Sequence, residues 1–146
     1  MKHPKRIGDT TAIAVMAALD LVGYAIAIPF GENTRYDLIA DDGKRLLRVQ
    51  CKTGRLRDGA VRFPTCSTYF HHRSARIGRR DYVGDIDAFG VYCPETSGVY
   101  LVPIEDAPLR CAAALRVTPP RNSQRRRIRF AADYELGSAN APTLLG

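Results

Sequence analysis

The sequence predicts an α/β domain, or a closely related α+β one, built on a mixed β-sheet. Apolar residues recur at helical spacing near the N-terminus, whereas short apolar runs separated by turn residues make up most of the remaining chain. The 146 residues are enough for one domain with a real core.

The helix is expected over residues 9–22, where apolar side chains line one face and Gly23 marks the end. Asp9 is expected at its start, as the N-cap or as an acid in the first turn. A strand over 24–29 and a turn over 30–33 follow.

Apolar runs and turn residues assign the later elements. We expect strands at 36–40, 45–53, 59–63, 87–93, 99–104 and 112–117, a loop or short mixed segment at 65–83, and a short helix at 128–134. Helices are then expected to flank the sheet. One domain is expected over 1–136, with a flexible C-terminal tail over 137–146.

Charge and cysteine content restrict the setting. The net charge of +7 arises from a surplus of arginine, which suits a polyanion such as nucleic acid, although a protein can also be basic without such a partner. The four cysteines form no CxxC pair, so free thiols in a reducing cytoplasm are expected rather than zinc or disulfides. No apolar run is long enough to span a membrane, and the N-terminal one is too short for a typical secretory signal.

A polar hairpin is the main functional signal. Asp42-Gly43 is typical of a tight turn. If residues 41 and 44 pair, Asp37 lies opposite Arg48.

Strand alternation then separates two kinds of side chain. Asp37, Arg48, Gln50 and Lys52 share one face, while Leu38, Leu47, Val49 and Cys51 share the other. Polar groups in buried strands need partners, and a divalent metal with a phosphodiester would supply them. An ordinary exposed strand face is the alternative interpretation.

Several motifs of the sequence resemble, in the same order, those of a PD-(D/E)XK endonuclease family that includes group I intron-encoded homing endonucleases. They are Gly8-Asp9, Pro29-Phe30-Gly31-Glu32-Asn33, Tyr36-Asp37-Leu38, Arg48-Val49-Gln50-Cys51-Lys52-Thr53-Gly54-Arg55 and Val91-Tyr92-Cys93-Pro94-Glu95-Thr96. The resemblance covers about residues 5–135. It implies a restriction-endonuclease-like core with the active site on a central hairpin.

The resemblance also implies roles for individual residues. Asp37 matches the metal-binding Asp of the motif, Lys52 matches its catalytic Lys, and Asp9 is similar in placement to the acid of the first helix. Two positions depart from the pattern: Tyr36 replaces the usual Pro, and Gln50 replaces the usual Asp or Glu and removes one negative charge.

Phosphodiester hydrolysis explains these residue types. Mg²⁺, or Mn²⁺, prefers oxygen ligands, which Asp9, Asp37, the Gln50 amide and the Cys51 backbone carbonyl would offer. Lys52 would activate water or stabilise developing charge.

Residues expected to contact DNA lie on polar and arginine-rich segments. They are Arg35, Arg55, Arg57, Ser67, His71, His72, Arg73, Arg80, Asn122, Gln124, Arg125, Arg126 and Arg127. Tyr82 is expected either to stack on an unpaired base or to pack in the core.

The resulting prediction is an Mg²⁺-dependent endodeoxyribonuclease of homing-endonuclease type. Its DNA partner is expected to be cut by a homo-oligomer, a dimer or tetramer, because one active site cuts one strand. The alternatives are a Holliday-junction or repair-type nuclease, and a DNA-binding module whose catalysis is weakened by Gln50.

Overall fold

The computed structural model describes residues 3–31, 33–71, 76–107, 111–120 and 128–137; within these ranges, the side chains of 68–71 and 76–79 are not described. The regular elements follow in chain order: α1 (Pro4–Leu21), β1 (Ala25–Ala27), β2 (Leu38–Asp41), β3 (Leu46–Thr53), β4 (Arg55–Arg57), β5 (Ala60–Pro64), β6 (Cys66–His71), β7 (Arg76–Asp81), β8 (Ala88–Cys93), β9 (Gly98–Pro103), a 3-10 turn (Ile104–Asp106), β10 (Ala112–Arg116) and a second 3-10 turn (Ala131–Asp133).

Helix α1 begins five residues earlier than the sequence predicted. Pro4 occupies the first helical position, where its missing N–H costs nothing, and the His3 ring accepts the Lys5 backbone N–H at 3.3 Å. The prediction that Asp9 starts the helix is therefore wrong, since Asp9 lies in the second turn. The buried side chains of α1 are Thr11, Val15 and Leu19, spaced four apart on one face.

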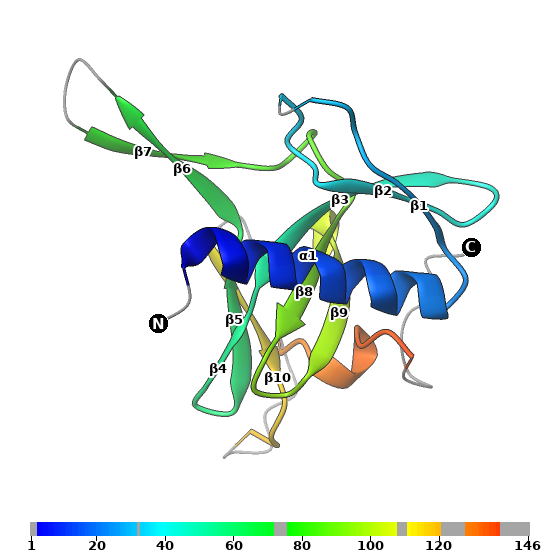
Figure 1. The fold of residues 1–146 in the computed structure, drawn as a ribbon. Helices are drawn as coiled ribbons and strands as arrows, with labels where there is room; N and C mark the ends of the chain where they lie inside the picture. Colours follow the sequence, from blue (N-terminus) through cyan, green and yellow to red (C-terminus); the bar gives the residue numbers. More distant parts are fainter. Residues whose placement is uncertain (1–2, 32, 72–75, 108–110, 121–127, 138–146) are drawn as a thin grey trace.

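Five strands form the central sheet in the order β1-β2-β3-β8-β9. The β3–β8 pair is parallel and the other pairs are antiparallel, so the sheet is mixed as predicted. A second sheet has the order β10-β5-β4. Within the described ranges, strands β6 and β7 pair only with each other, and Figure 1 shows this ribbon extending away from the rest of the molecule. The loop expected at 65–83 is thus largely a hairpin.

The two faces of the central sheet are covered differently. In Figure 1, α1 crosses the sheet, and its Val15 and Leu19 belong to the apolar cluster that contains Leu38 and Val49. A Cβ added to Gly90 on β8 would lie 2.6 Å from a methyl carbon of Val15, so the helix approaches the sheet closely there.

The opposite face is covered by the second sheet rather than by helices. Val61 and Phe63 of β5 and Leu115 of β10 pack in one cluster with Phe89 and other residues of β8 and β9. Within the described ranges α1 is the single α-helix, and a 3-10 turn at Ala131–Asp133 stands where the short helix at 128–134 was expected. The expectation of helices flanking the sheet is therefore corrected; the tail beyond Gly137 lies outside the described residues.

Two further findings concern the setting of the chain. No helix in the described part of the chain has the length and apolar character needed to cross a membrane. All four cysteines are free, and the fully buried one is Cys93.

Candidate active site

The β2–β3 turn lies one residue further along the chain than predicted. Asp42 and Arg45 flank a two-residue turn made by Gly43 and Lys44, and Gly43 adopts a φ of 90°. The Asp42 carboxylate accepts the backbone N–H groups of Lys44 at 2.7 Å and Arg45 at 2.6 Å, which stabilises this turn over the predicted one.

The strand register differs accordingly by two residues. Leu38 pairs with Val49, so Asp37 lies across from Gln50 rather than from Arg48. Because side chains alternate with a period of two, a shift of two residues leaves each of them on its predicted face.

The face of the hairpin toward α1 is apolar. Leu38, Leu47 and Val49 are buried, and the half-buried Cys51 packs against the same cluster. Burial raises the pKa of the Cys51 thiol to about 12, helped by the nearby Asp37 carboxylate. Cys51 therefore offers the opposite face only its backbone.

The other face carries Asp37, Gln50 and Lys52. The Asp37 carboxylate accepts the Cys51 backbone N–H at 2.8 Å, and the Asp37 N–H donates to the Val49 carbonyl at 2.8 Å. Burial raises the pKa of Asp37, and the Cys51 N–H and the positive charge of Lys52 partly oppose that shift. An acid and a base therefore interact in partly desolvated surroundings.

Lys52 contacts Tyr82, which the sequence interpretation did not assign to the site. The Lys52 ammonium donates to the Tyr82 hydroxyl at 3.0 Å and lies 4.8 Å from the centre of its ring. Tyr82 is 3% exposed, which excludes the interpretation that its ring is free to stack on a base.

Arg35 lies on the same tyrosine ring, with its guanidinium carbon 4.1 Å from the ring centre. It donates to Asp85 at 3.3 Å, to the Ser67 hydroxyl at 3.1 Å and to the Asp81 carbonyl at 3.0 Å. Arg35 therefore joins the residues before β2 to the base of the β6–β7 ribbon. The signal for Tyr82 and Asp85 in the sequence was the acidic stretch 81–87 directly after the arginine-rich segment.

Asp9 does not join this group, which corrects its predicted role in the metal site. Thr11 faces the sheet, and its hydroxyl lies 2.6 Å from that of Thr53. Two residues of α-helix turn the chain through about 200°, so Asp9 points away from the sheet. Its exposed carboxylate pairs with Lys5 at 3.2 Å.

Arg48 was also predicted on the polar face but serves another contact. Its guanidinium binds both carboxylate oxygens of Asp87, at 3.2 Å each, and its backbone N–H donates to the same carboxylate at 2.8 Å. Burial raises the pKa of Asp87, but these bonds to Arg48 outweigh it and hold the pKa below its usual value. Arg48 thus connects β3 to the residues before β8.

The expected DNA-contacting residues fall into three groups. Arg57 is exposed, Arg55 lies 3.9 Å from Glu95, and Arg80 is exposed beside Asp85 at 3.4 Å. Ser67 and Arg35 are engaged with each other. His72, Arg73, Asn122, Gln124, Arg125, Arg126 and Arg127 lie outside the described residues, as does the side chain of His71.

The donor set of this face fits a hard cation that keeps water ligands. Asp37 offers a carboxylate oxygen, and the half-buried Gln50 amide has no hydrogen-bond partner among the described residues. Across the described ranges, no three His, Cys, Asp or Glu side chains form a cluster able to hold a metal. The available protein donors are therefore few: Asp37, Gln50 and the Cys51 backbone carbonyl.

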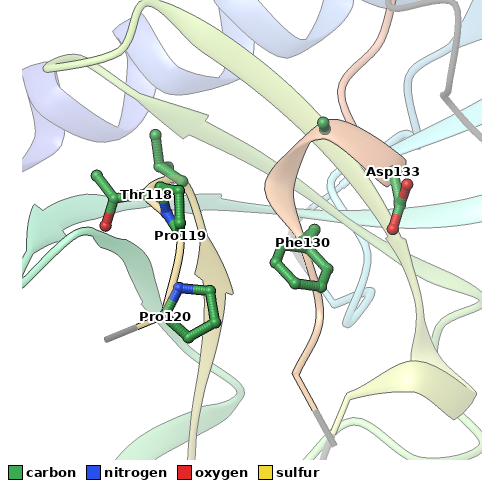
Figure 2. Close-up of a pocket in the computed structure, with 7 residues that line it drawn as sticks. Thr118, Pro119, Pro120, Phe130 and Asp133 are labelled. Atoms are coloured by element: carbon green, nitrogen blue, oxygen red, sulfur yellow. The ribbon is translucent and has the colours of Figure 1, made fainter. Parts of the chain in front are cut away.

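A separate hollow of about 450 Å³ lies elsewhere and has a different character. Figure 2 shows it between the segment Thr118, Pro119 and Pro120 and the side chains of Phe130 and Asp133. Its described lining has a single charged side chain, that of Asp133, and no lysine or histidine. The Asp37 carboxylate, the Gln50 amide and the Lys52 amine lie instead at the β2–β3 hairpin.

Comparison with known proteins identifies the fold and the family. No curated protein matches the chain. The fold is similar to a solved structure described as "The structure of a bacterial homing endonuclease: I-Ssp6803I", with a TM-score of 0.72 and 24% sequence identity over 92% of this chain and 89% of that chain. This likeness establishes a restriction-endonuclease-like fold. A family model described as PD-(D/E)XK endonuclease matches residues 2–137, nearly the whole chain, and the chain therefore belongs to the PD-(D/E)XK endonuclease family.

Proposed function

We propose that the protein is a metal-dependent DNA endonuclease that hydrolyses phosphodiester bonds at the polar face of the β2–β3 hairpin. The observation that carries this proposal is the position of Asp37, Gln50 and Lys52 on one face of two adjacent strands. Membership of an endonuclease family supplies the reaction class.

Asp37, Gln50 and the Cys51 carbonyl would hold Mg²⁺ or Mn²⁺. When bound, the cation would lower the pKa of a water and neutralise charge on the phosphate. Asp37 is oriented for this role by the Cys51 N–H, which leaves its second oxygen available. The neutral Gln50 adds a ligand without adding a second negative charge.

Lys52 is the second functional group. Its ammonium would donate to the attacking water or to a phosphate oxygen, where negative charge grows during the reaction. One of its three N–H groups is used by Tyr82, so two remain for substrate.

DNA would lie along exposed arginines of the chain. Arg57 and Arg80 are exposed, and the β6–β7 ribbon carries further arginines in its sequence as it extends from the body (Figure 1). Such residues suit phosphate contacts, which fix the position of the duplex without reading its sequence. A dimer or tetramer of the chain would bring two active sites to the two strands.

The homing type of endonuclease is part of the proposal, supported by the fold shared with I-Ssp6803I. One observation favours a second candidate, a DNA-binding module with weakened catalysis. Among the described residues, Asp37 is the single carboxylate that the hairpin brings to Lys52, since Asp9 points elsewhere. A nuclease acting on branched DNA would use the same residues.

The test is cleavage of supercoiled plasmid and of a four-way DNA junction, with Mg²⁺, Mn²⁺ or EDTA. Asp37→Asn keeps the acceptor for the Cys51 N–H but removes the charge. Asp41→Asn is the matched control, since Asp41 accepts the Gly43 N–H in the same hairpin.

We expect metal-dependent nicking that falls about 100-fold or more in Asp37→Asn and stays near wild type in Asp41→Asn. Full activity of Asp37→Asn would refute the site. Binding without cleavage of either DNA would favour the binding module, and preference for the junction would favour the branched-DNA nuclease.

A further inference from the structure

Tyr82 is held rigidly beside the proposed catalytic lysine. It directly follows β7, and its carbonyl accepts the backbone N–H groups of Asp85 at 2.9 Å and Ile86 at 3.3 Å. Its ring packs edge to face on Phe89, with ring centres 5.6 Å apart and planes at 89°. The backbone turn and the ring packing together leave the hydroxyl little freedom to move.

Two cations fix the ring further. Arg35 lies 4.1 Å from the ring centre, and its guanidinium is itself bound by Asp85 and by the Asp81 carbonyl. Lys52 is bound at the hydroxyl, 3.0 Å away. Moving Tyr82 would therefore break its contacts with both Arg35 and Lys52.

We propose that Tyr82 is a positioning residue that holds the Lys52 ammonium at the place where the phosphodiester is cut. This inference rests on the proposed function of Lys52. A lysine side chain has four methylene carbons joined by rotatable bonds, so an unrestrained ammonium would spend much of its time away from a substrate. A fixed hydroxyl acceptor selects one position, as functional groups require.

A phenol suits this task better than a carboxylate. Both accept a hydrogen bond from an ammonium, but a carboxylate would also cancel the positive charge that the reaction uses. Tyr82 holds Lys52 and leaves its charge for the water and phosphate. The three carboxylates of the 81–87 segment have other partners. Asp85 is bound to Arg35 and Arg80, Asp87 is bound to Arg48, and Asp81 accepts the Val83 N–H at 3.1 Å.

The test compares Tyr82→Phe with Tyr100→Phe. Tyr100 is also 3% exposed and lies in the same apolar cluster, and its hydroxyl bonds Thr96 at 2.9 Å. Each variant thus loses one buried phenol hydroxyl, and only the first loses a bond to Lys52.

We expect the single-turnover cleavage rate of Tyr82→Phe to fall about tenfold or more, since small displacements of a reacting group have large effects. The DNA concentration at half-saturation and the unfolding midpoint should match those of Tyr100→Phe. Equal cleavage rates in the two variants would overturn the proposal.

A second readout does not depend on cleavage. The chain has four lysines, at positions 2, 5, 44 and 52, so mass spectrometry after amine labelling can compare Lys52 with the exposed Lys44. Removing the hydroxyl should raise the Lys52-to-Lys44 labelling ratio at least about threefold, because the amine no longer has to leave a hydrogen bond. An unchanged labelling ratio would overturn the proposed contact, whether or not the wild-type protein cleaves DNA. Absence of cleavage by the wild-type protein would refute only the proposed function.

Discussion

The two faces of β3 differ in what they contact. Leu47 and Val49 point into the cluster under α1, whereas Lys52 points toward Tyr82 and Gln50 lies across from Asp37. Adjacent residues of one strand therefore serve different purposes: one set buries apolar area, and the other presents an amide and a base. This separation predicts that substitutions on the two faces affect stability and cleavage independently.

The largest expected effect is on the polar face. Lys52→Ala should lower the cleavage rate by about 100-fold or more, the usual range for loss of a group that acts on the transition state. Its free energy of unfolding should change by less than about 1 kcal/mol. Plasmid nicking and urea unfolding measure both, with the exposed turn residue Lys44→Ala as control; equal nicking by the two variants would contradict the assignment.

The next effect belongs to the apolar face. Leu38 is 1% exposed, so Leu38→Ala leaves a cavity and should lower the free energy of unfolding by about 2–5 kcal/mol. The fraction that remains folded at low temperature should still nick DNA at the wild-type rate per folded molecule. The control is Leu46→Ala, since Leu46 is exposed on the same pair of strands and its loss should hardly change the free energy of unfolding. A similar decrease in both variants would show that burial does not control stability here.

A smaller effect is expected where α1 approaches β8. Gly90→Ala would place its Cβ 2.6 Å from one methyl carbon of Val15 and 3.1 Å from one of Val49. The crowding should cost about 1–3 kcal/mol. If crowding is the cause, adding Gly90→Ala to a Val15→Ala variant should cost little further stability. A loss as large as that caused by Gly90→Ala in the wild-type protein would contradict the crowding explanation.

The smallest effect concerns the ion pair between Arg48 and Asp87. Because the folded pKa of Asp87 is below its usual value of 3.8, the pair contributes fully above that pH and is lost as pH falls through the folded pKa. Both side chains are about a third exposed, so the contribution is expected to be at most about 1 kcal/mol. Asp87→Asn should have a slightly lower free energy of unfolding than the wild type at pH 7. On acidification below about pH 4, it should lose less of that free energy than the wild type does. The same loss in both proteins would contradict this.

The sequence predicted those strands and turns that a local pattern of apolar and turn residues marks. The β2–β3 hairpin and the strands β8 and β9 were predicted because apolar residues alternate or run continuously between clear turn signals. The register of β2 and β3 was wrong by two residues, since the side-chain bonds of Asp42 that stabilise the turn are invisible in a one-dimensional pattern. The β6–β7 ribbon was missed because its strands pair only with each other and carry no repeated apolar face.

The candidate site was predictable in the same uneven way. Gln50 and Lys52 lie two apart on one strand, so strand alternation put them on one face. Asp37 joined them only through the expected turn, and it kept its face because the register error was an even number of residues. The role expected for Asp9 came from the resemblance, and the pattern along the chain does not show which face of α1 meets the sheet closely. Thr11 lies on that face and Asp9 on another. Tyr82 comes from a distant segment, and only the folded chain brings it to Lys52.

The most direct test of this account uses two neighbouring residues that point in opposite directions. Gln50→Ala and Val49→Ala would be compared for single-turnover nicking in Mg²⁺ and for urea unfolding, on the same preparations. The account predicts that Gln50→Ala loses nicking by about tenfold or more at nearly unchanged stability. Val49→Ala should lose about 1–3 kcal/mol of stability but keep its nicking rate per folded molecule. If nicking and stability fell together in both variants, the division of β3 into a structural face and a catalytic face would be wrong.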